Sequence, residues 1–149
     1  MIDEFLQKLY MDPTKIPEKC FVKRPQILNL YHASMENGIK ELTPRVPTAV
    51  ERYENTTIPR ISASLGVMGC VKAIQHKLFK KEHYTLYVYK LDLTPASIVV
   101  KPNTLMVKDR NETNEFWVLT PTKVHHVATY QCTYDGKLAN LVPVYINDK

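Results

Sequence analysis

The alternation of apolar and polar residues along this 149-residue chain predicts a protein built mainly from strands. Tyr84 to Leu91 alternates with a period of two, which is typical of a half-buried strand. Turn signals separate the apolar runs: Asn37-Gly38 and, before the last run, the hairpin dipeptide Asp135-Gly136. The expected strands are Ile27 to Ala33, Arg60 to Ala63, Tyr84 to Leu91, Glu115 to Leu119, Val124 to Cys132 and Leu141 to Ile146.

Helical spacing of apolar residues occurs in two places. The first is Ile2 to Met11, and the second follows Ser64, which we expect to be the helix N-cap. The apolar face of the second helix is expected to consist of Leu65, Met68, Val71, Ile74 and Leu78. The segment Ile39 to Tyr53 contains two prolines and is expected to be an irregular loop.

Strands and helices do not alternate regularly, so a doubly wound parallel sheet is not expected. The pattern predicts an α+β fold: a split or curved, mostly antiparallel sheet with a few helices. The length fits one domain over residues 1–149, with residues 1–26 as a helical or irregular lead-in.

Composition and charge narrow the class of protein. Hydrophobic residues make up 44% and charged residues 23%, as in ordinary globular proteins, and no apolar run approaches the ~20 residues of a membrane span. The first residues lack the basic region of a signal peptide, so we expect a cytoplasmic protein that does not act at a membrane. Cys20, Cys70 and Cys132 have no C-x-x-C spacing and are expected to be reduced, partly buried thiols.

The formal net charge of +5 favours a partner that carries phosphate or carboxylate groups: a nucleotide, a nucleic acid or an acidic protein. The basic residues are scattered along the sequence. The densest cluster lies where the second helix should end, where cations suit the helix dipole without any ligand. This cluster consists of Lys77, Lys80 and Lys81 with His76 and His83.

Two polar residues interrupt apolar strand segments. His32 follows Leu30 and Tyr31, and Glu115 opens the run from Phe116 to Leu119. An imidazole and a carboxylate in such positions are costly unless they are paired, hydrogen-bonded or used in chemistry. They are therefore the first candidates for a functional site.

Three segments resemble the site elements of the diphtheria-toxin type of ADP-ribosyltransferase, the family that includes the poly(ADP-ribose) polymerases. Leu30-Tyr31-His32-Ala33-Ser34 resembles the strand that opens their NAD site. Arg60-Ile61-Ser62-Ala63-Ser64 resembles their short strand that runs into a helix, and Asn114-Glu115-Phe116-Trp117-Val118-Leu119 resembles the strand with the catalytic glutamate. The chain also resembles small phage and bacterial proteins with this pattern. The resemblance covers roughly residues 27 to 133 and implies an ADP-ribosyltransferase-like fold.

The resemblance implies a role for each matching residue. His32 would bond the ribose of the adenosine half of NAD, and the backbone of Ala33 would hold the nicotinamide amide. Glu115 would bond the nicotinamide ribose and stabilise the cation that forms as nicotinamide leaves. The other implied contacts to NAD involve Tyr31, Ser34, Ser62, Ser64 and, at a phosphate, Arg60. NAD would be the substrate.

Two departures from the family affect turnover more than fold. Ala33 stands where the family has glycine, and the aromatic residue that stacks on nicotinamide falls near Ala73, so Tyr31, Trp117 or Tyr53 would have to replace it. The functional hypothesis is a phage- or bacterium-derived protein, in a phage's case acting in the host cytoplasm. It would use NAD to modify a host protein or nucleic acid, as a toxin or in counter-defence.

The alternative is a non-catalytic inhibitor of a host factor on the same scaffold.

Each candidate also has a purely structural interpretation. His32 then bonds backbone in the core, Glu115 and Arg60 face solvent, Ser64 caps a helix and Trp117 anchors the core. The pair His125-His126 has no third metal ligand at useful spacing. A third hypothesis is a two-histidine phosphoesterase for cyclic nucleotides, because His32 and His83 both begin a His-x-Ser/Thr sequence.

Overall fold

The computed structural model describes residues 16–45, 58–71, 83–102, 115–134 and 139–146. Two short 3-10 helices come first, η2 (Glu18–Cys20) and η3 (Pro25–Ile27). The strands are β1 (Tyr31–Ser34), β2 (Glu41–Leu42), β3 (Ile61–Ser64), β4 (His83–Leu91), β5 (Val99–Val100), β6 (Glu115–Val118), β7 (Thr122–Tyr134) and β8 (Ala139–Ile146). A helix begins at residue 67 and is described to residue 71.

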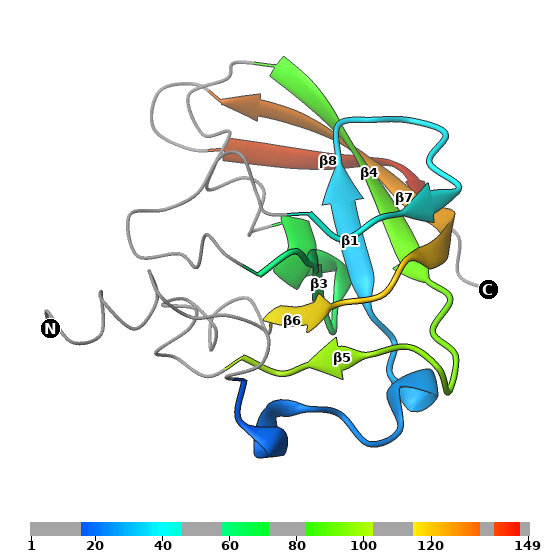
Figure 1. The fold of residues 1–149 in the computed structure, drawn as a ribbon. Coiled ribbons are helices and arrows are strands. Elements are labelled where there is room, and N and C mark those ends of the chain that lie inside the picture. Colours follow the sequence, from blue (N-terminus) through cyan, green and yellow to red (C-terminus); the bar gives the residue numbers. More distant parts are fainter. Residues whose placement is uncertain (1–15, 46–57, 72–82, 103–114, 135–138, 147–149) are drawn as a thin grey trace, which may run out of the picture.

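The eight strands form one sheet in the order β2-β7-β4-β1-β3-β6-β5, with β8 on the outer side of β7. Neighbouring strands pair in antiparallel fashion throughout these ladders. The long strands β4, β7 and β8 lie together on one side of β1, and the short strands β3, β6 and β5 lie on the other (Figure 1). The expected α+β class, a mostly antiparallel sheet with few helices, is confirmed.

The two halves of the sheet meet at a narrow junction between β1 and β3. The ladder between these strands consists of a single pair, Tyr31 opposite Ser64, whereas all four residues of β1 pair with β4. In this register His32 would lie opposite Ala63 and Ala33 opposite Ser62, but neither pair belongs to the ladder. The sheet therefore divides next to His32, one of the candidate site residues.

Three groups of buried side chains hold the sheet together. One face of the centre is covered by a cluster around Leu30, Tyr89 and Phe116, and a second cluster, around Val71, Leu86 and Val88, packs on the other face of β1 and β4. A third cluster joins η2 to β5 and β6 and consists of Ile16, Cys20, Ile58, Val100 and Trp117. The strand β1 thus lies between the first and second clusters, and β6 lies between the first and third.

The turn after β1 has the expected conformation. Gly38 of the Asn37-Gly38 dipeptide has φ of 80°, a left-handed conformation that suits glycine. The hydroxyl of the buried Tyr89 donates to the carbonyl oxygen of Glu36 at 2.6 Å, which attaches this turn to β4. The loop expected over residues 39–53 also contains the short strand β2, and its residues 46–53 lie outside the described part of the chain.

Three sequence expectations are wrong in detail. Pro25 starts a 3-10 turn, so the strand expected from Ile27 begins only at Tyr31, and Ile27 is 69% exposed. Ser64 ends β3 and does not cap the helix; the first helical hydrogen bond runs from the Cys70 N–H to the Gly66 carbonyl. Leu65 and Met68 are exposed, and only Val71 of the described positions on the expected apolar face is buried. The expected helix from Ile2 to Met11, the Asp135-Gly136 turn, Ile74 and Leu78 lie outside the described residues.

The three cysteines are free thiols and all are buried. Burial raises the pKa of Cys70 to about 12 and also raises the pKa of Cys132, because a thiolate loses its hydration inside the protein. We therefore expect the thiols of the folded protein to react negligibly with Ellman's reagent at pH 8. In guanidinium chloride, where the protein is unfolded, all three thiols should react. Rapid reaction of the native protein would contradict this assignment of the thiols.

None of the helices in the described part of the chain is long and apolar enough to cross a membrane.

Candidate functional site

The register of the central strands aligns residues from all three candidate segments. Tyr31 of β1 lies opposite Ser64 of β3, and Ser64 lies opposite Glu115 of β6. Residues opposite one another in an antiparallel ladder share a face of the sheet. Tyr31, Ser64 and Glu115 therefore form a row across three adjacent strands, although they are far apart in sequence.

Glu115 is a buried carboxylate, 8% exposed, and not the solvent-facing residue of the structural interpretation. Trp117 lies two residues further along β6 on the same face, and its indole Nε1–H donates to Glu115 Oε2 at 2.9 Å. Trp117 itself is completely buried. A hydrogen bond to a carboxylate is stronger than one between neutral groups, so Trp117 holds Glu115 in a defined orientation.

Arg60 is the second charged residue of this buried region and is 3% exposed, so the expectation that it is solvated is wrong. Its guanidinium carbon lies 4.3 Å from the centroid of the Trp117 ring, and Nη1 donates to the carbonyl oxygen of Ile58 at 3.1 Å. The cation–π contact and the hydrogen bond compensate part of the cost of burying the cation. Arg60 thus supports Trp117, which in turn orients Glu115.

His32 is half-buried at the junction between β1 and β3. Its Nδ1 lies 2.7 Å from the carbonyl oxygen of Ser62. A carbonyl oxygen only accepts hydrogen bonds, so Nδ1 carries a proton and donates it in this contact. If the β1–β3 ladder continued, Ser62 would lie opposite Ala33; instead its carbonyl oxygen accepts from the His32 ring. This hydrogen bond links the two halves of the sheet.

The alternation of β1 places His32 and Glu115 differently. Tyr31 and Ala33 are on the sheet face of Glu115, while His32 belongs to the opposite face of β1 and turns toward the backbone of β3. The strands β1 and β6 are separated by β3, so about 10 Å lies between their backbones. The structure therefore places the two residues on strands that flank β3 and on opposite faces of the sheet, apart from the turn of the His32 ring toward the Ser62 carbonyl.

The backbone of Ala33 points toward the divergence between β1 and β3. The carbonyl oxygen of Leu30 accepts from the Leu91 N–H, 2.9 Å away, at the end of β4, so the polar groups of Leu30 face β4. These directions alternate along a strand, which turns the N–H and C=O of Tyr31 and Ala33 toward β3. Beyond the pair Tyr31–Ser64 the β1–β3 ladder ends, so Ala33 presents an amide and a carbonyl outside that ladder.

The remaining site candidates fall into two groups. Ser62 shares the face of Ser64, Glu115 and Trp117, and Ser62 pairs directly with Trp117. Ser34, by contrast, uses its Oγ to accept the Glu36 N–H at 3.0 Å in the turn after β1. Ser62 and Ser64 therefore lie in the region of Glu115, whereas Ser34 has a local turn contact.

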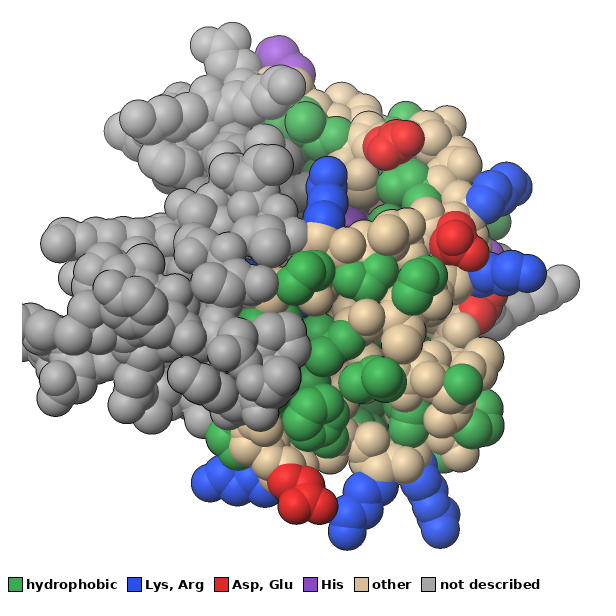
Figure 2. Space-filling model, in the orientation of Figure 1, with side chains coloured by type: hydrophobic (Ala, Val, Ile, Leu, Met, Phe, Trp, Pro, Cys, Tyr) green, Lys and Arg blue, Asp and Glu red, His purple; other side chains and the backbone are tan. Residues whose placement is uncertain are grey.

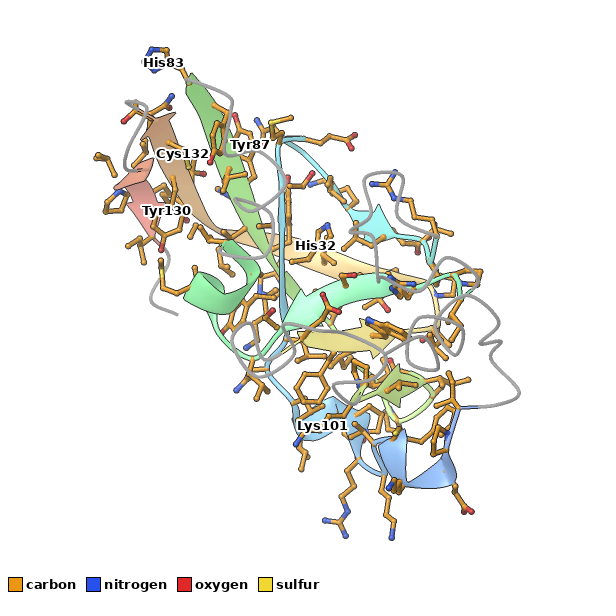
Figure 3. All side chains as sticks on the ribbon, turned by 90° about the vertical axis from the view of Figure 1, so that its left-hand side faces the viewer. His32, His83, Tyr87, Lys101, Tyr130 and Cys132 are labelled. Carbon is orange, nitrogen blue, oxygen red and sulfur yellow. The ribbon has the colours of Figure 1, made fainter. Side chains whose placement is uncertain are left out.

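His83 lies at the exposed start of β4, far from His32 (Figure 3). His32 pairs with Tyr89, which is six residues further along β4, or about 20 Å. Two imidazoles that act as acid and base on one phosphate must both reach it, so this placement argues against the two-histidine phosphoesterase.

His125 and His126 make other contacts. Nδ1 of His125 lies 2.9 Å from an Asp92 carboxylate oxygen, and Nε2 of His126 lies 2.6 Å from the hydroxyl of Thr129. In the described residues no group of three or more His, Cys, Asp or Glu side chains is arranged to hold a metal ion.

Sequence reasoning found Glu115 but treated Trp117 as a core anchor or as a replacement for the stacking aromatic, and not as a partner of Glu115. Its burial is confirmed, and its hydrogen bond to the carboxylate is an additional role. The available signal was the spacing Glu-x-Trp within a strand, because residues two apart share a face. The stacking of Arg60 on Trp117 joins residues 57 positions apart in sequence and left no local signal.

In comparisons with protein-family models, with curated proteins and with solved structures, nothing matches this chain.

Proposed function

We propose that the chain is an ADP-ribosyltransferase-like protein that binds NAD across β1, β3 and β6 and uses Glu115 in the transfer of ADP-ribose. The observation that carries this proposal is the adjacency of the three segments in the sheet, in the row Tyr31–Ser64–Glu115. These are the three segments that resemble the family's site elements. A shared nucleotide site requires such adjacency, and unrelated segments meet in this way only by coincidence.

The geometry suits the parts of a dinucleotide. The divergence of β1 and β3 leaves the backbone amide and carbonyl of Ala33 outside that ladder, and a carboxamide needs one acceptor and one donor of this kind. His32 and Glu115 are assigned to different riboses of NAD, which a pyrophosphate separates. Because His32 and Glu115 belong to opposite faces of the sheet, one extended ligand would have to pass through the divergence of β1 and β3, where the His32 ring reaches the Ser62 carbonyl.

The proposed reaction breaks the bond between the nicotinamide nitrogen and C1′ of its ribose. Nicotinamide leaves with the bonding electron pair, an acceptor nucleophile forms the new bond at C1′, and its proton passes to solvent. Positive charge develops on the ribose as the bond breaks. The carboxylate of Glu115, held by the Trp117 indole at 2.9 Å, is a preorganised negative charge beside that centre.

A thermal-shift panel with NAD, ADP-ribose and 2′,3′-cyclic nucleotides tests the binding half of this proposal. A ligand at a hundredfold its dissociation constant that binds only the folded state adds ~2.7 kcal/mol to stability. We expect NAD and ADP-ribose to raise the melting temperature and cyclic nucleotides to leave it unchanged. No shift with either NAD or ADP-ribose would contradict the proposal.

Substitution of His32 separates its structural role from ligand binding. Asparagine carries an amide N–H near the position of Nδ1, so His32→Asn is expected to keep the bond to the Ser62 carbonyl while removing Nε2. We expect both His32→Asn and His32→Ala to weaken ADP-ribose binding by about tenfold, the worth of one hydrogen bond of ~1.4 kcal/mol. Only His32→Ala should lower the unfolding midpoint. Unchanged affinity in His32→Asn, measured by calorimetry, would remove His32 from the nucleotide site.

A second candidate function, a non-catalytic binder on the same scaffold, is favoured by the burial of the charged residues. Arg60 already contacts Trp117 and the Ile58 carbonyl, and Glu115 is 8% exposed. Such a protein would block a host factor without consuming NAD. A pull-down of a host protein that survives the double substitution His32→Ala and Glu115→Ala would support this alternative over the enzyme.

A further inference from the structure

Exposed cations gather at the end of the molecule formed by η2, η3 and β5. Figure 2 shows Lys and Arg side chains along this lower edge, and Figure 3 places Lys101 beside the two 3-10 helices. The cations, here called the basic edge, are Lys19, Lys23, Arg24 and Lys101. These segments also contain the exposed carboxylate of Glu18, so the described residues of this edge carry a net charge of +3.

Backbone hydrogen bonds bring the segments of the basic edge together. The Lys101 N–H donates to the Cys20 carbonyl at 2.7 Å, and the Val22 N–H donates to the Val99 carbonyl at 2.9 Å. Phe21 forms an antiparallel bridge with Val100 between these bonds. The backbone that carries the four cationic side chains is therefore held together by bonds that do not involve those side chains.

Most other cations in the described residues lie near an acidic residue or are buried; the exception is Arg45, which is exposed and whose backbone bridges to that of Arg60. Lys123 lies directly opposite Glu41 in the β2–β7 pair, and Lys40 precedes Glu41 in sequence. Lys90 pairs with His125, whose ring contacts Asp92, and Arg60 is buried against Trp117. The basic edge is thus a concentrated excess of positive charge within a chain of pI about 9.1.

We propose that the basic edge binds a single strand of nucleic acid through its phosphates. Repeating phosphates complement several cations along one edge, and a domain of pI above 9 with clustered Lys and Arg has the electrostatic character of a nucleic-acid-binding protein. Ile27 and Ile98, which are 69% and 46% exposed, lie in the same segments and offer apolar surface to unstacked bases. A run of acidic side chains such as polyglutamate has no base-sized apolar group beside its charges, so it leaves the exposed Ile27 and Ile98 unused.

The test measures anisotropy of a labelled 20-nucleotide oligothymidine with the full chain as salt is raised. Four phosphate contacts on a single strand give a slope of about −3 for log K against log salt, so affinity should fall about 50-fold between ~50 and ~200 mM. Replacing Lys19, Lys23, Arg24 and Lys101 by glutamine should weaken binding at low salt at least tenfold and flatten the slope. These side chains are exposed, so the melting temperature should not change.

The matched control removes three lysines and one arginine elsewhere, by glutamine at Lys40, Arg45, Lys90 and Lys123, and should bind within twofold of the original chain. Equal losses in the two variants would show a general effect of net charge and overturn the proposal. A slope near zero for the unmodified chain would do the same, as would competition by polyglutamate of equal charge as strong as that by unlabelled oligothymidine. None of these measurements uses NAD, so the result stands apart from the proposed transfer reaction.

Discussion

Glu115→Gln is expected to lower the rate of NAD cleavage by about 10²–10³-fold, because it removes the negative charge next to the developing cation. Glutamine has the size of glutamate and keeps a side-chain oxygen that can accept from the Trp117 Nε1–H. In the unmodified chain this nitrogen lies 2.9 Å from the Glu115 carboxylate oxygen. The substitution should therefore preserve the fold and the thermal shift with NAD. Release of nicotinamide, followed by chromatography, measures the rate.

Glu41→Gln is the matched control, since Glu41 is an exposed carboxylate on β2, outside the three site strands. It should cleave NAD at the original rate. If Glu115→Gln were within a few-fold of that rate, Glu115 would not be the catalytic carboxylate. Binding of NAD without any cleavage by the unmodified chain would instead leave the non-catalytic binder as the function.

Trp117→Ala is expected to have the largest effect on stability, a loss of about 3–5 kcal/mol in the free energy of unfolding. Trp117 is fully buried in the cluster that joins η2, β5 and β6, and its removal leaves a cavity. It also takes the indole donor from Glu115 and the ring face from Arg60. Urea unfolding followed by far-UV circular dichroism measures the loss; fluorescence is unsuitable because Trp117 is the only tryptophan.

Two further variants show how much of this loss of stability comes from the indole hydrogen bond and how much from core burial. Trp117→Phe keeps an aromatic face for Arg60 but removes the Nε1–H donor, so it should cost about 1–3 kcal/mol through the buried carboxylate left without that bond. Val144→Ala removes an apolar side chain that is 65% exposed on β8 and should change stability by less than ~0.5 kcal/mol. A cost of Trp117→Ala no greater than that of Val144→Ala would contradict the placement of Trp117 in the core.

The strands with regular patterns could be predicted from the sequence alone. Tyr84 to Leu91 and Glu115 to Leu119 match β4 and β6 to within one residue at each end, because half-buried or fully buried strands leave clear apolar patterns. The start of β1 could not be predicted, because Ile27 and Leu28 look like strand residues while Pro25 favours a 3-10 turn. Leu65 and Met68 were expected on the apolar face of the second helix but are exposed, because helical spacing alone does not determine which side chains other elements cover.

The candidate site could be predicted only in its parts. A polar residue within an apolar run identified His32 and Glu115 locally, whereas their neighbours depend on pairing between distant strands. The bond from His32 to the Ser62 carbonyl requires the β1–β3 ladder to end after one pair, and nothing in either segment specifies that register. The burial of Arg60 against Trp117 likewise depends on a contact between distant residues.

The order of strands in the sheet has a consequence for synthesis of the protein. β7, residues Thr122–Tyr134, pairs with β4 and also with β2 and β8, yet it follows β2 and β4 in sequence by more than 30 residues. A nascent chain of 120 residues has β1 and β4 but lacks the partner for the far edge of β4. These long-range pairings must wait until β7 has been synthesised, which makes folding slow compared with that of a helical protein of this size.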